Sequence, residues 1–258
     1  MSLTITFDKQ ADSTEETQII GGDRVEGALA PLTINSTAIS FDPRILVLMD
    51  SSRTSTTVTG VRSAMNSLGY IENQNYTITG KSLGTTYTGA GDLDEPYAYN
   101  IVIISTNGGD LGSSALGTRL NAFLAKGNHL IMMTFSWNIR ISNSVLFNYT
   151  VYSPYTYSGN QSNFGTAQTL TADVGHPITN TTLSIGQPFY NNGVTLTSGS
   201  QNLATYSNGQ LAIAVRQVLN ARIVALNFFP DNLSSATTTQ VNRLNLLVNS
   251  ILWCVNLI

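Results

Sequence analysis

Three short apolar runs constrain the fold of this chain more than any other feature. They are Ile45–Met49, Ile101–Ile104 and Leu130–Met133. Each run is too short to cross a membrane as a helix, and too continuously apolar for a strand with one wet face. Such runs are typical of parallel strands buried on both faces. Because helical spacing fills the gaps at 56–68 and 113–126, the sequence predicts an α/β fold: three layers, with a mostly parallel sheet flanked by helices.

The remaining elements of the fold are predicted from local patterns. A strand is expected at Asn75–Thr79, and the third apolar run is expected to continue as a strand to Phe135. Ser207-Asn-Gly209 contains the Asn-Gly pair of a tight hairpin. The chain is expected to end in an amphipathic helix at 239–255. Further strands are predicted at 194–197, 203–206, 210–216 and 222–228.

Residues 1–42 differ from the rest of the chain. Leu3-Thr-Ile-Thr-Phe7 alternates like a strand, but the segment lacks helical periodicity and has too few apolar residues for its own core. We expect an extended arm that lies on its own domain or on a neighbouring copy. The predicted organisation is therefore an arm at 1–42 and an α/β domain at 43–258. That domain carries a Tyr/Asn/Ser-rich insertion at about 137–165.

The composition is poor in charge. Charged residues make up 10% of the chain, well below the usual quarter, while Ser, Thr and Asn supply about a third. Such a surface suits a protein covered by neighbours, or a polar coat exposed to harsh conditions. The charge is also uneven: residues 1–110 hold 13 acids and 6 bases, whereas residues 111–258 hold 2 acids and 6 bases. Opposite charges of this kind favour head-to-tail contacts between copies.

Several functional classes are disfavoured by the sequence. Cys254 is the single cysteine, so no internal disulfide can form. A pI of about 5.2 without Lys/Arg clusters argues against direct nucleic-acid binding. No run of 18 apolar residues, no Sec signal peptide and no phosphate-binding Gly-x-x-x-x-Gly-Lys loop is visible. We expect no cofactor, and the localisation stays open.

The order of several sequence pieces resembles a known family. After the strand Ile45–Asp50 come Tyr99–Ile104 with Asn107-Gly-Gly109, a helix closing on Ala125-Lys-Gly127, and the strand His129–Phe135. Next come Gly175-His-Pro-Ile-Thr179, Ala221–Leu226 and Asn249–Trp253. Residues 44–256 thus resemble the class I glutamine amidotransferase-like fold, particularly its trehalose-utilisation-type branch. The resemblance covers about four fifths of the chain and implies a flavodoxin-like, amidotransferase-like domain.

The catalytic residues of that family are not matched. In that family, the strand that follows the Gly-terminated helix ends in Gly-x-Cys-x-Gly. The corresponding strand here is His129–Phe135, and the stretch that matches the motif is Thr134-Phe-Ser-Trp-Asn138. The family's late His-x-Glu pair is also missing, since no Glu follows Glu95. Cys254 lies in the predicted last helix, where a small buried hydrophobe is the simpler interpretation. We therefore expect that the chain has no amidotransferase activity and is not an enzyme.

Other reactive groupings remain as alternatives. A serine hydrolase would need Ser136, His176 and Asp173 to meet. The carboxylates of Asp92, Asp94 and Glu95 could bind a hard cation such as Ca²⁺. An acidic loop exposed to solvent is the simpler interpretation of these residues. A ligand could contact Asp50, at the end of the first buried strand, with Asn107, Gly108 and Gly109 offering backbone N–H groups. Capping of the next helix is the simpler role for Asp50.

The favoured hypothesis is a non-catalytic structural subunit that assembles with copies of itself, as in a virion, a sheath or a filament. In it the arm contributes Leu3, Ile5 and Phe7, and the tyrosine-rich segment contributes Tyr149, Tyr152, Tyr155 and Tyr157 as a contact surface. A carbohydrate-binding domain is a further alternative, in which Tyr152, Tyr155 and Trp137 stack on sugars.

Overall fold

The chain divides into two compact units in the computed structural model, Met1–Phe41 and Asp42–Ile258. The structure describes residues 3–7, 16–20, 42–84, 86–95, 98–106, 114–134, 136–137, 148–157, 162–163, 167–173, 175–180, 184–231, 233 and 237–258. The structure describes only the backbone, and not the side chains, at residues 3–7, 16–20, 114, 149, 157, 162 and 163.

The first unit contains a pair of strands. β1 (Leu3–Phe7) and β2 (Glu16–Ile20) run antiparallel, with Leu3 opposite Ile20 and Phe7 opposite Glu16. The predicted strand at Leu3–Phe7 is confirmed. Its partner β2 was not predicted, because Glu16–Ile20 follows an acidic stretch that reads as a turn.

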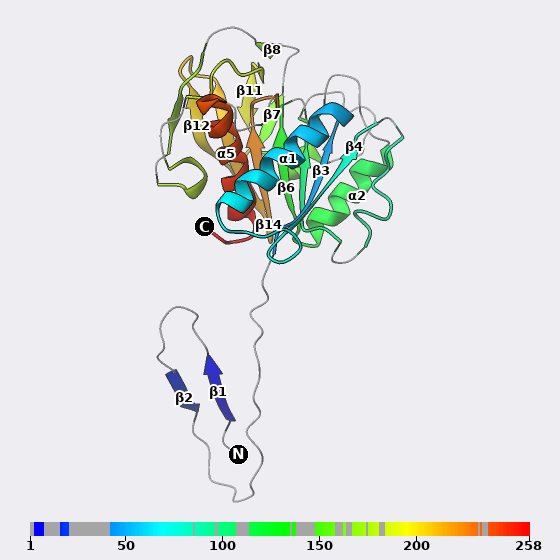
Figure 1. Ribbon diagram of the computed structural model, residues 1–258, viewed down its shortest axis with the longest axis vertical. Coiled ribbons are helices and arrows are strands. Elements are labelled where there is room, and N and C mark those ends of the chain that lie inside the picture. The colour runs from blue at the N-terminus through cyan, green and yellow to red at the C-terminus, as the bar shows by residue number, and fades with distance from the viewer. Residues whose placement is uncertain are drawn as a thin grey trace, which may run out of the picture. The chain divides into compact units, whose positions relative to one another are not determined.

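The second unit is built on an eight-stranded sheet with the order β4-β3-β5-β6-β14-β13-β12-β9 (Figure 1). From β4 to β14 neighbouring strands run parallel, and β13, β12 and β9 continue the sheet antiparallel. The predicted α/β fold with a mostly parallel sheet is confirmed. The strands are β3 (Arg44–Met49), β4 (Thr77–Ser82), β5 (Ile101–Ile104), β6 (His129–Met133), β9 (Leu170–Ala172), β12 (Ser200–Tyr206), β13 (Leu211–Val218) and β14 (Ala221–Leu226).

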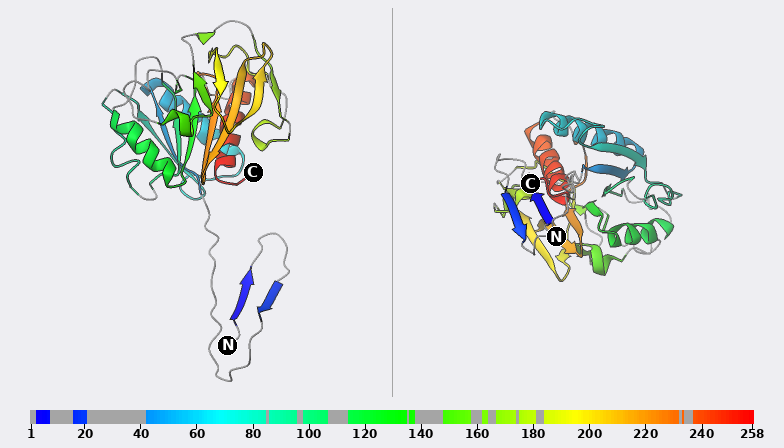
Figure 2. Two further views of the ribbon diagram at one scale, coloured as in Figure 1. Left: turned by 180° about the vertical axis from the view of Figure 1, so that it is seen from behind. Right: turned by 90° about the horizontal axis from the view of Figure 1, so that it is seen from below.

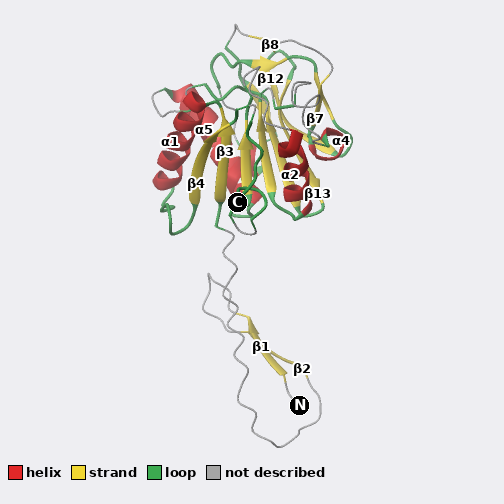
Figure 3. Cartoon of the chain, turned by 90° about the vertical axis from the view of Figure 1, so that its right-hand side faces the viewer, coloured by secondary structure: helices red, strands yellow, loops and turns green. Residues whose placement is uncertain are grey.

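Helices cover both faces of this sheet, which gives the three predicted layers. The helices α1 (Ser51–Ser67) and α5 (Thr238–Cys254) pack on one face. The helix α2 (Ser114–Ala125) lies on the other face, as the view from behind shows (Figure 2). Figure 3 shows the sheet edge-on between the two helical layers.

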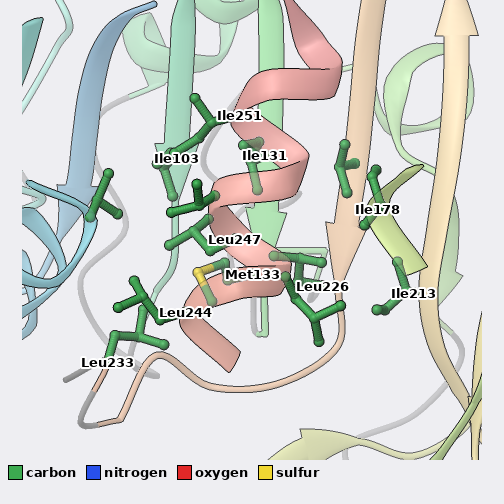
Figure 4. Packing of buried hydrophobic residues seen from close by; sticks show 14 of the residues in the cluster. Ile103, Ile131, Met133, Ile178, Ile213, Leu226, Leu233, Leu244, Leu247 and Ile251 are labelled. Carbon is green, nitrogen blue, oxygen red and sulfur yellow. The ribbon is translucent and has the colours of Figure 1, made fainter. Parts of the chain in front are cut away.

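The apolar runs are buried on both sides because successive side chains of a strand point to opposite faces. In β3, Ile45 and Val47 belong to the core under α1 and α5, whereas Leu46 and Leu48 belong to the core under α2. In the first core, Leu244, Leu247 and Ile251 of α5 lie against strand residues that include Ile103, Ile131 and Met133 (Figure 4). In the second core, α2 contributes Leu116, Leu120, Phe123 and Leu124.

Smaller elements stand beside the main sheet. β7 (Tyr155–Tyr157) pairs antiparallel with β11 (Val194–Leu196), and β8 (Ser162–Asn163) pairs with β10 (Tyr190–Asn191). A short helix, α4 (Tyr149–Tyr152), and the 3₁₀ turn η1 (Pro177–Thr179) complete the described elements. No helix in the described part of the chain has the length and apolar character needed to span a bilayer.

Helix α1 begins five residues earlier than predicted because Asp50 caps it. The Asp50 side chain accepts a hydrogen bond from the Arg53 backbone N–H at 3.2 Å. The apolar stripe of 56–68 therefore belongs to the later turns of a longer helix. The hairpin turn was predicted correctly: Gly209 has a φ of +83°, which glycine adopts without strain.

Candidate functional site

The carboxyl ends of β3 and β5 form the topological switch point of the sheet. The chain leaves β3 through α1 to β4 on one side, and then returns to β5 on the other side of β3. Ligands of open α/β sheets bind in the crevice at this point. Asp50 follows β3 and Ser105 follows β5, where the Ser105 N–H donates to the Leu48 carbonyl at 3.1 Å. The predicted anion-binding residues Asn107, Gly108 and Gly109 lie outside the described residues.

At the switch point, Asp50 forms an ion pair within its own helix turn. Its Oδ1 accepts a hydrogen bond from the Ser52 hydroxyl at 2.7 Å, and its Oδ2 pairs with Arg53 Nη1 at 2.8 Å. Burial opposes ionisation of Asp50, but the bonds from Ser52 and Arg53 outweigh it and lower the pKa. Arg53 also pairs with Asp231 at 3.4 Å and lies over the ring of Phe229, 4.6 Å from its centroid. These contacts cap α1 and hold the Arg53 side chain in place beside the carboxyl end of β3.

Ser136 occupies the position after β6 where the resembled family carries its nucleophile. The residue is fully buried, and its hydroxyl donates to the Ile104 carbonyl at 2.7 Å. Nearby, the Ser105 hydroxyl donates to the Thr134 carbonyl at 3.1 Å, and Trp137 is buried as well. These hydroxyls join the ends of β5 and β6. A substrate could reach the Ser136 oxygen only if this turn opened.

The structure does not bring Ser136, His176 and Asp173 together, so the hydrolase alternative lacks its geometry. Ser136 follows the carboxyl end of β6. His176 instead lies against Trp253 at the end of α5, with ring centroids 5.4 Å apart, and Trp253 in turn stacks on Arg222. Arg222 belongs to the start of β14, beside the amino end of β6. The serine and the histidine are thus at opposite ends of the sheet.

Hydrogen bonds to nearby backbone N–H groups explain the positions of the His176 and Asp173 side chains. His176 Nδ1 accepts the Ile178 N–H at 3.3 Å and so caps the turn η1. Asp173 Oδ1 accepts the Gly175 N–H at 3.0 Å. Burial lowers the pKa of His176, while Asp173 opposes that shift. Both side chains shape the turn that packs on α5.

The other histidine and the cysteine are also structural. His129 Nδ1 accepts the Arg222 N–H at 3.1 Å, which joins the start of β6 to β14. Burial, helped by Arg222, lowers the pKa of His129 to about 4, so the ring is neutral at pH 7. Cys254 is fully buried, and burial raises the pKa of its thiol. A thiol of this kind is a poor nucleophile.

The acidic loop residues do not converge on a metal. Asp92 accepts hydrogen bonds from Lys81 Nζ at 2.5 Å and from the Tyr87 hydroxyl at 2.7 Å. Asp94 pairs instead with Arg119 of α2 at 2.8 Å, and Glu95 is exposed. Among the residues that the structure describes, no three His, Cys, Asp or Glu side chains gather in a metal-binding group. Asp92 and Asp94 each serve an ion pair to a different element.

A hollow of about 590 Å³ opens beside the Lys81–Asp92 pair. It lies at the carboxyl end of β4, and Lys81, Ser82, Gly84, Thr86, Tyr87 and Asp92 contribute to its lining. Sequence reasoning noticed the acidic loop but missed Lys81 and Tyr87. The predicted strand ended at Thr79, so Lys81 fell in a predicted loop, whereas β4 continues to Ser82. Nothing in the sequence pairs this lysine with Asp92.

The tyrosine-rich segment is placed differently from the prediction. Tyr155 is 1% exposed, and its ring meets Trp137 edge to face with centroids 5.3 Å apart. Because both rings are buried, neither can stack on a sugar nor serve a contact with another subunit. Tyr152 is partly buried against the same core. The side chains of Tyr149, Tyr157, Leu3, Ile5 and Phe7 lie outside the described part of the chain.

Comparison with known proteins supports the fold and nothing finer. No protein-family model and no curated protein matches the chain. Among solved structures, the chain is similar to a ThuA-like protein from Bacteroides uniformis, at 12% identity and a TM-score of 0.58, over 90% of this chain and 95% of that one. A ThuA-like protein from Parabacteroides merdae matches at 14% identity and a TM-score of 0.54, over 83% of this chain and 90% of that one.

A cytoplasmic protein from Salmonella typhimurium LT2 is also similar, at 14% identity and a TM-score of 0.54. The match covers all of this chain and 95% of that one. At these identities the likeness concerns the fold alone. The expected amidotransferase-like fold is thus found in the solved structures, with ThuA-like proteins among the neighbours.

Proposed function

We propose that this chain is a non-catalytic structural subunit, built on an amidotransferase-like domain, that assembles with copies of itself. A virion, a sheath and a filament are the settings that this proposal covers. One observation carries the proposal: the residue after β6, Ser136, is fully buried, and its hydroxyl donates a hydrogen bond to the Ile104 carbonyl.

The chemistry of that position supports the absence of nucleophilic catalysis. A nucleophile of this fold is displayed on an exposed turn, and it needs a base within hydrogen-bond reach. Ser136 is buried, and His176 is bonded to the Ile178 N–H at the other end of the sheet. His129 is likewise bonded at the start of β6.

The surface and the first unit support assembly. Val151 of α4 is 36% exposed and Leu196 of β11 is 38% exposed, and both lie in or beside the tyrosine-rich segment. Charged residues are scarce in the whole chain, at 10%. A two-stranded sheet such as β1–β2 is marginally stable alone, so it gains from a surface to pack on. A neighbouring copy would supply such a surface.

Sedimentation velocity of the full chain over a hundredfold concentration range, together with negative-stain microscopy, tests the proposal. We expect species larger than one chain that grow with concentration. Leu196→Asp should weaken assembly, because it places a charge on the proposed contact surface. Leu68→Asp is the matched control, since Leu68 is 57% exposed at the end of α1, which covers the opposite face of the sheet. A full chain that stays monomeric throughout would refute the proposal.

A further inference from the structure

We propose that the outer edge of β4 binds the β1–β2 sheet of a neighbouring copy through backbone hydrogen bonds. The eight-stranded sheet of one chain would then continue into the two strands of the next chain. This inference rests on the assembly proposed above, and it names the surface that receives the first unit.

β4 stands at one end of the eight-stranded sheet (Figure 3). At the start of the strand, the Thr77 N–H donates to the Pro43 carbonyl at 2.8 Å. Directly after the strand, the Leu83 N–H donates to the Met49 carbonyl at 2.7 Å. Because the backbone groups of successive residues in a strand point to opposite sides, the even-numbered residues of β4 direct their N–H and C=O groups away from β3.

Gly80 and Ser82 make these outward groups accessible. Both residues are exposed, and in the described part of the chain no strand lies beyond β4. Gly80 also has no side chain that could shield its backbone. A row of backbone donors and acceptors of this kind is a template for a further strand.

The opposite end of the sheet is a poorer template. The strand there, β9, is three residues long, whereas β4 has six residues. Directly before β9, the Gln168 N–H donates to the Gly186 carbonyl at 2.7 Å, and the Gln168 carbonyl accepts the Ile185 N–H at 3.2 Å. The chain itself thus covers the start of that edge.

β4 lacks the features that commonly protect an exposed edge from pairing, which are prolines, bulges and free charges. It contains no proline, and its six residues pair with β3 without a register shift. Its one charged residue, Lys81, is bonded to Asp92 at 2.5 Å. The edge is therefore regular enough to accept a strand.

The first unit is an occupant that gains from this edge. A two-stranded sheet is at best marginally stable in water, whereas three or more strands can be stable. β1 and β2 have five residues each, which is close to the length of β4. Addition to β4 would give the pair its further strands, and it would give the outward groups of β4 their partners.

Charge complementarity favours the first unit over a second copy of β4. Residues 1–41 contain 6 acids and 2 bases. At the edge of β4 the base is the more exposed member of the ion pair, since the Lys81 side chain is 42% exposed and that of Asp92 is 9% exposed. An acidic unit is attracted to this ammonium, whereas two paired β4 edges would bring two such ammonium groups near each other.

Hydrogen–deuterium exchange of the full chain, measured by mass spectrometry, tests the inference. At concentrations where sedimentation shows assemblies, the Gly80 and Ser82 amides should exchange roughly tenfold more slowly than in single chains obtained by dilution. The turn at Leu219–Asn220 is the control, because Leu219 is 78% exposed and belongs to neither proposed contact surface. Its exchange should not change with concentration.

A short bis-maleimide cross-linker identifies the occupant. Ser82→Cys places a thiol in β4, while Ile5→Cys and Gln18→Cys place one in the middle of β1 and of β2. The native Cys254 is buried and does not compete. We expect cross-linked dimers when the Ser82→Cys chain is mixed with one of the two first-unit variants, and none from the Ser82→Cys chain alone.

Ser82→Pro removes one outward N–H and no hydrogen bond between β4 and β3. Proline is tolerated where the N–H of an edge strand faces solvent. The concentration needed for assembly should rise roughly fivefold or more, because one intermolecular hydrogen bond is lost. Ser82→Ala is the matched control: it keeps the N–H and should assemble like the unchanged chain. Circular dichroism checks both folds, and exchange and cross-linking decide the matter if Ser82→Pro does not fold.

Several results would overturn the inference while the assembly itself stands. One is equal exchange of the Gly80 and Ser82 amides in assembled and single chains, whether fast or slow. Slow exchange in single chains would mean that the edge is covered within one chain. Cross-linking of the Ser82→Cys chain to itself would identify a second β4 as the occupant, and no cross-link in either mixture would exclude the first unit. Normal assembly of a folded Ser82→Pro chain would also contradict it. A chain that never assembles refutes the earlier proposal instead, and sedimentation alone shows this.

Discussion

The hydroxyl of Ser136 donates a hydrogen bond to the carbonyl of Ile104 at 2.7 Å, and this contact joins the ends of two central strands. An identical type of bond occurs at the surface, where the Ser67 hydroxyl donates to the Ala64 carbonyl, also at 2.7 Å. The two serines therefore form a matched pair that differs in burial.

Ser136→Ala should destabilise the chain, because it removes the donor from a buried site. We expect the free energy of unfolding to fall by about 1–2 kcal/mol. Ser67→Ala should change it by about 0.5 kcal/mol or less, because water replaces the lost bond. Urea denaturation measures both. Equal effects in the two variants would contradict the described burial of Ser136.

Tyr155→Phe should be neutral or stabilising by up to about 1 kcal/mol. The Tyr155 hydroxyl is buried without a hydrogen-bond partner among the described residues, so its removal relieves a desolvation cost and keeps the ring against Trp137. Tyr206→Phe is the contrasting variant, because the Tyr206 hydroxyl donates to the Asn227 carbonyl. In Tyr206→Phe, the free energy of unfolding measured by urea denaturation should fall by about 1–2 kcal/mol. A loss in Tyr155→Phe as large as that in Tyr206→Phe would show that the first hydroxyl has a partner.

Gly60→Ala should be destabilising even though alanine favours helices. An added Cβ at Gly60, in the middle of α1, would lie 2.1 Å from the Leu233 carbonyl oxygen. Because this atom belongs to backbone, we expect a net loss of about 1–3 kcal/mol. Gly84→Ala, whose Cβ meets open space, should leave the melting temperature nearly unchanged. Thermal unfolding followed by circular dichroism compares the two. If Gly60→Ala melts above the unchanged chain, the close approach of α1 to Leu233 is wrong.

His129 should make the chain less stable at acidic pH. Its pKa is about 4 in the folded chain, against an ordinary value of 6.5. The unfolded chain therefore binds more protons than the folded chain between these values. The free energy of unfolding should fall as the pH is lowered through this window, by on the order of 2 kcal/mol. The lowered pKa of His176 acts in the same direction.

His129→Asn isolates this contribution. An asparagine side-chain oxygen can accept the Arg222 N–H in place of Nδ1, but it does not titrate. The variant should lose less stability than the unchanged chain between pH 6.5 and 4 in urea titrations at several pH values. Parallel curves for the two proteins would exclude a depressed pKa at His129.

Deletion of residues 2–40 should leave a folded but non-assembling protein. Both hydrophobic cores draw on residues from Ile45 onward, and the second unit begins at Asp42. Circular dichroism should show a retained α/β spectrum, while sedimentation velocity should show a single small species. Assembly that survives the deletion would mean that the first unit plays no part in it.

The elements that could be predicted from sequence are those whose burial leaves a local pattern. Ile101–Ile104 is apolar at every position because both faces of β5 are covered, so a run of four residues is enough to reveal the strand. The stripe on α5 and the Asn208-Gly209 turn are likewise local signals. The strand order was not predicted, because the hand of a crossover leaves open on which side of the sheet the next strand is added.

The site was less predictable because it depends on contacts between distant segments. Tyr155 is buried because β7 pairs with β11, about 40 residues later in the chain, and tyrosine spacing carries no trace of that pairing. His176 and Ser136 lie at opposite ends of the sheet because η1 packs on the end of α5. The pairing of Lys81 with Asp92 depends on the path of a loop without periodicity.

The burial of Cys254 has a practical consequence. The chain has a single thiol, located in the last turn of α5 and closed to solvent in the folded chain. An alkylating dye will therefore modify it only when this helix detaches, and the rate of labelling will report how often that occurs. The protein thus carries a native probe of its own opening, which serves for every variant above without an engineered label.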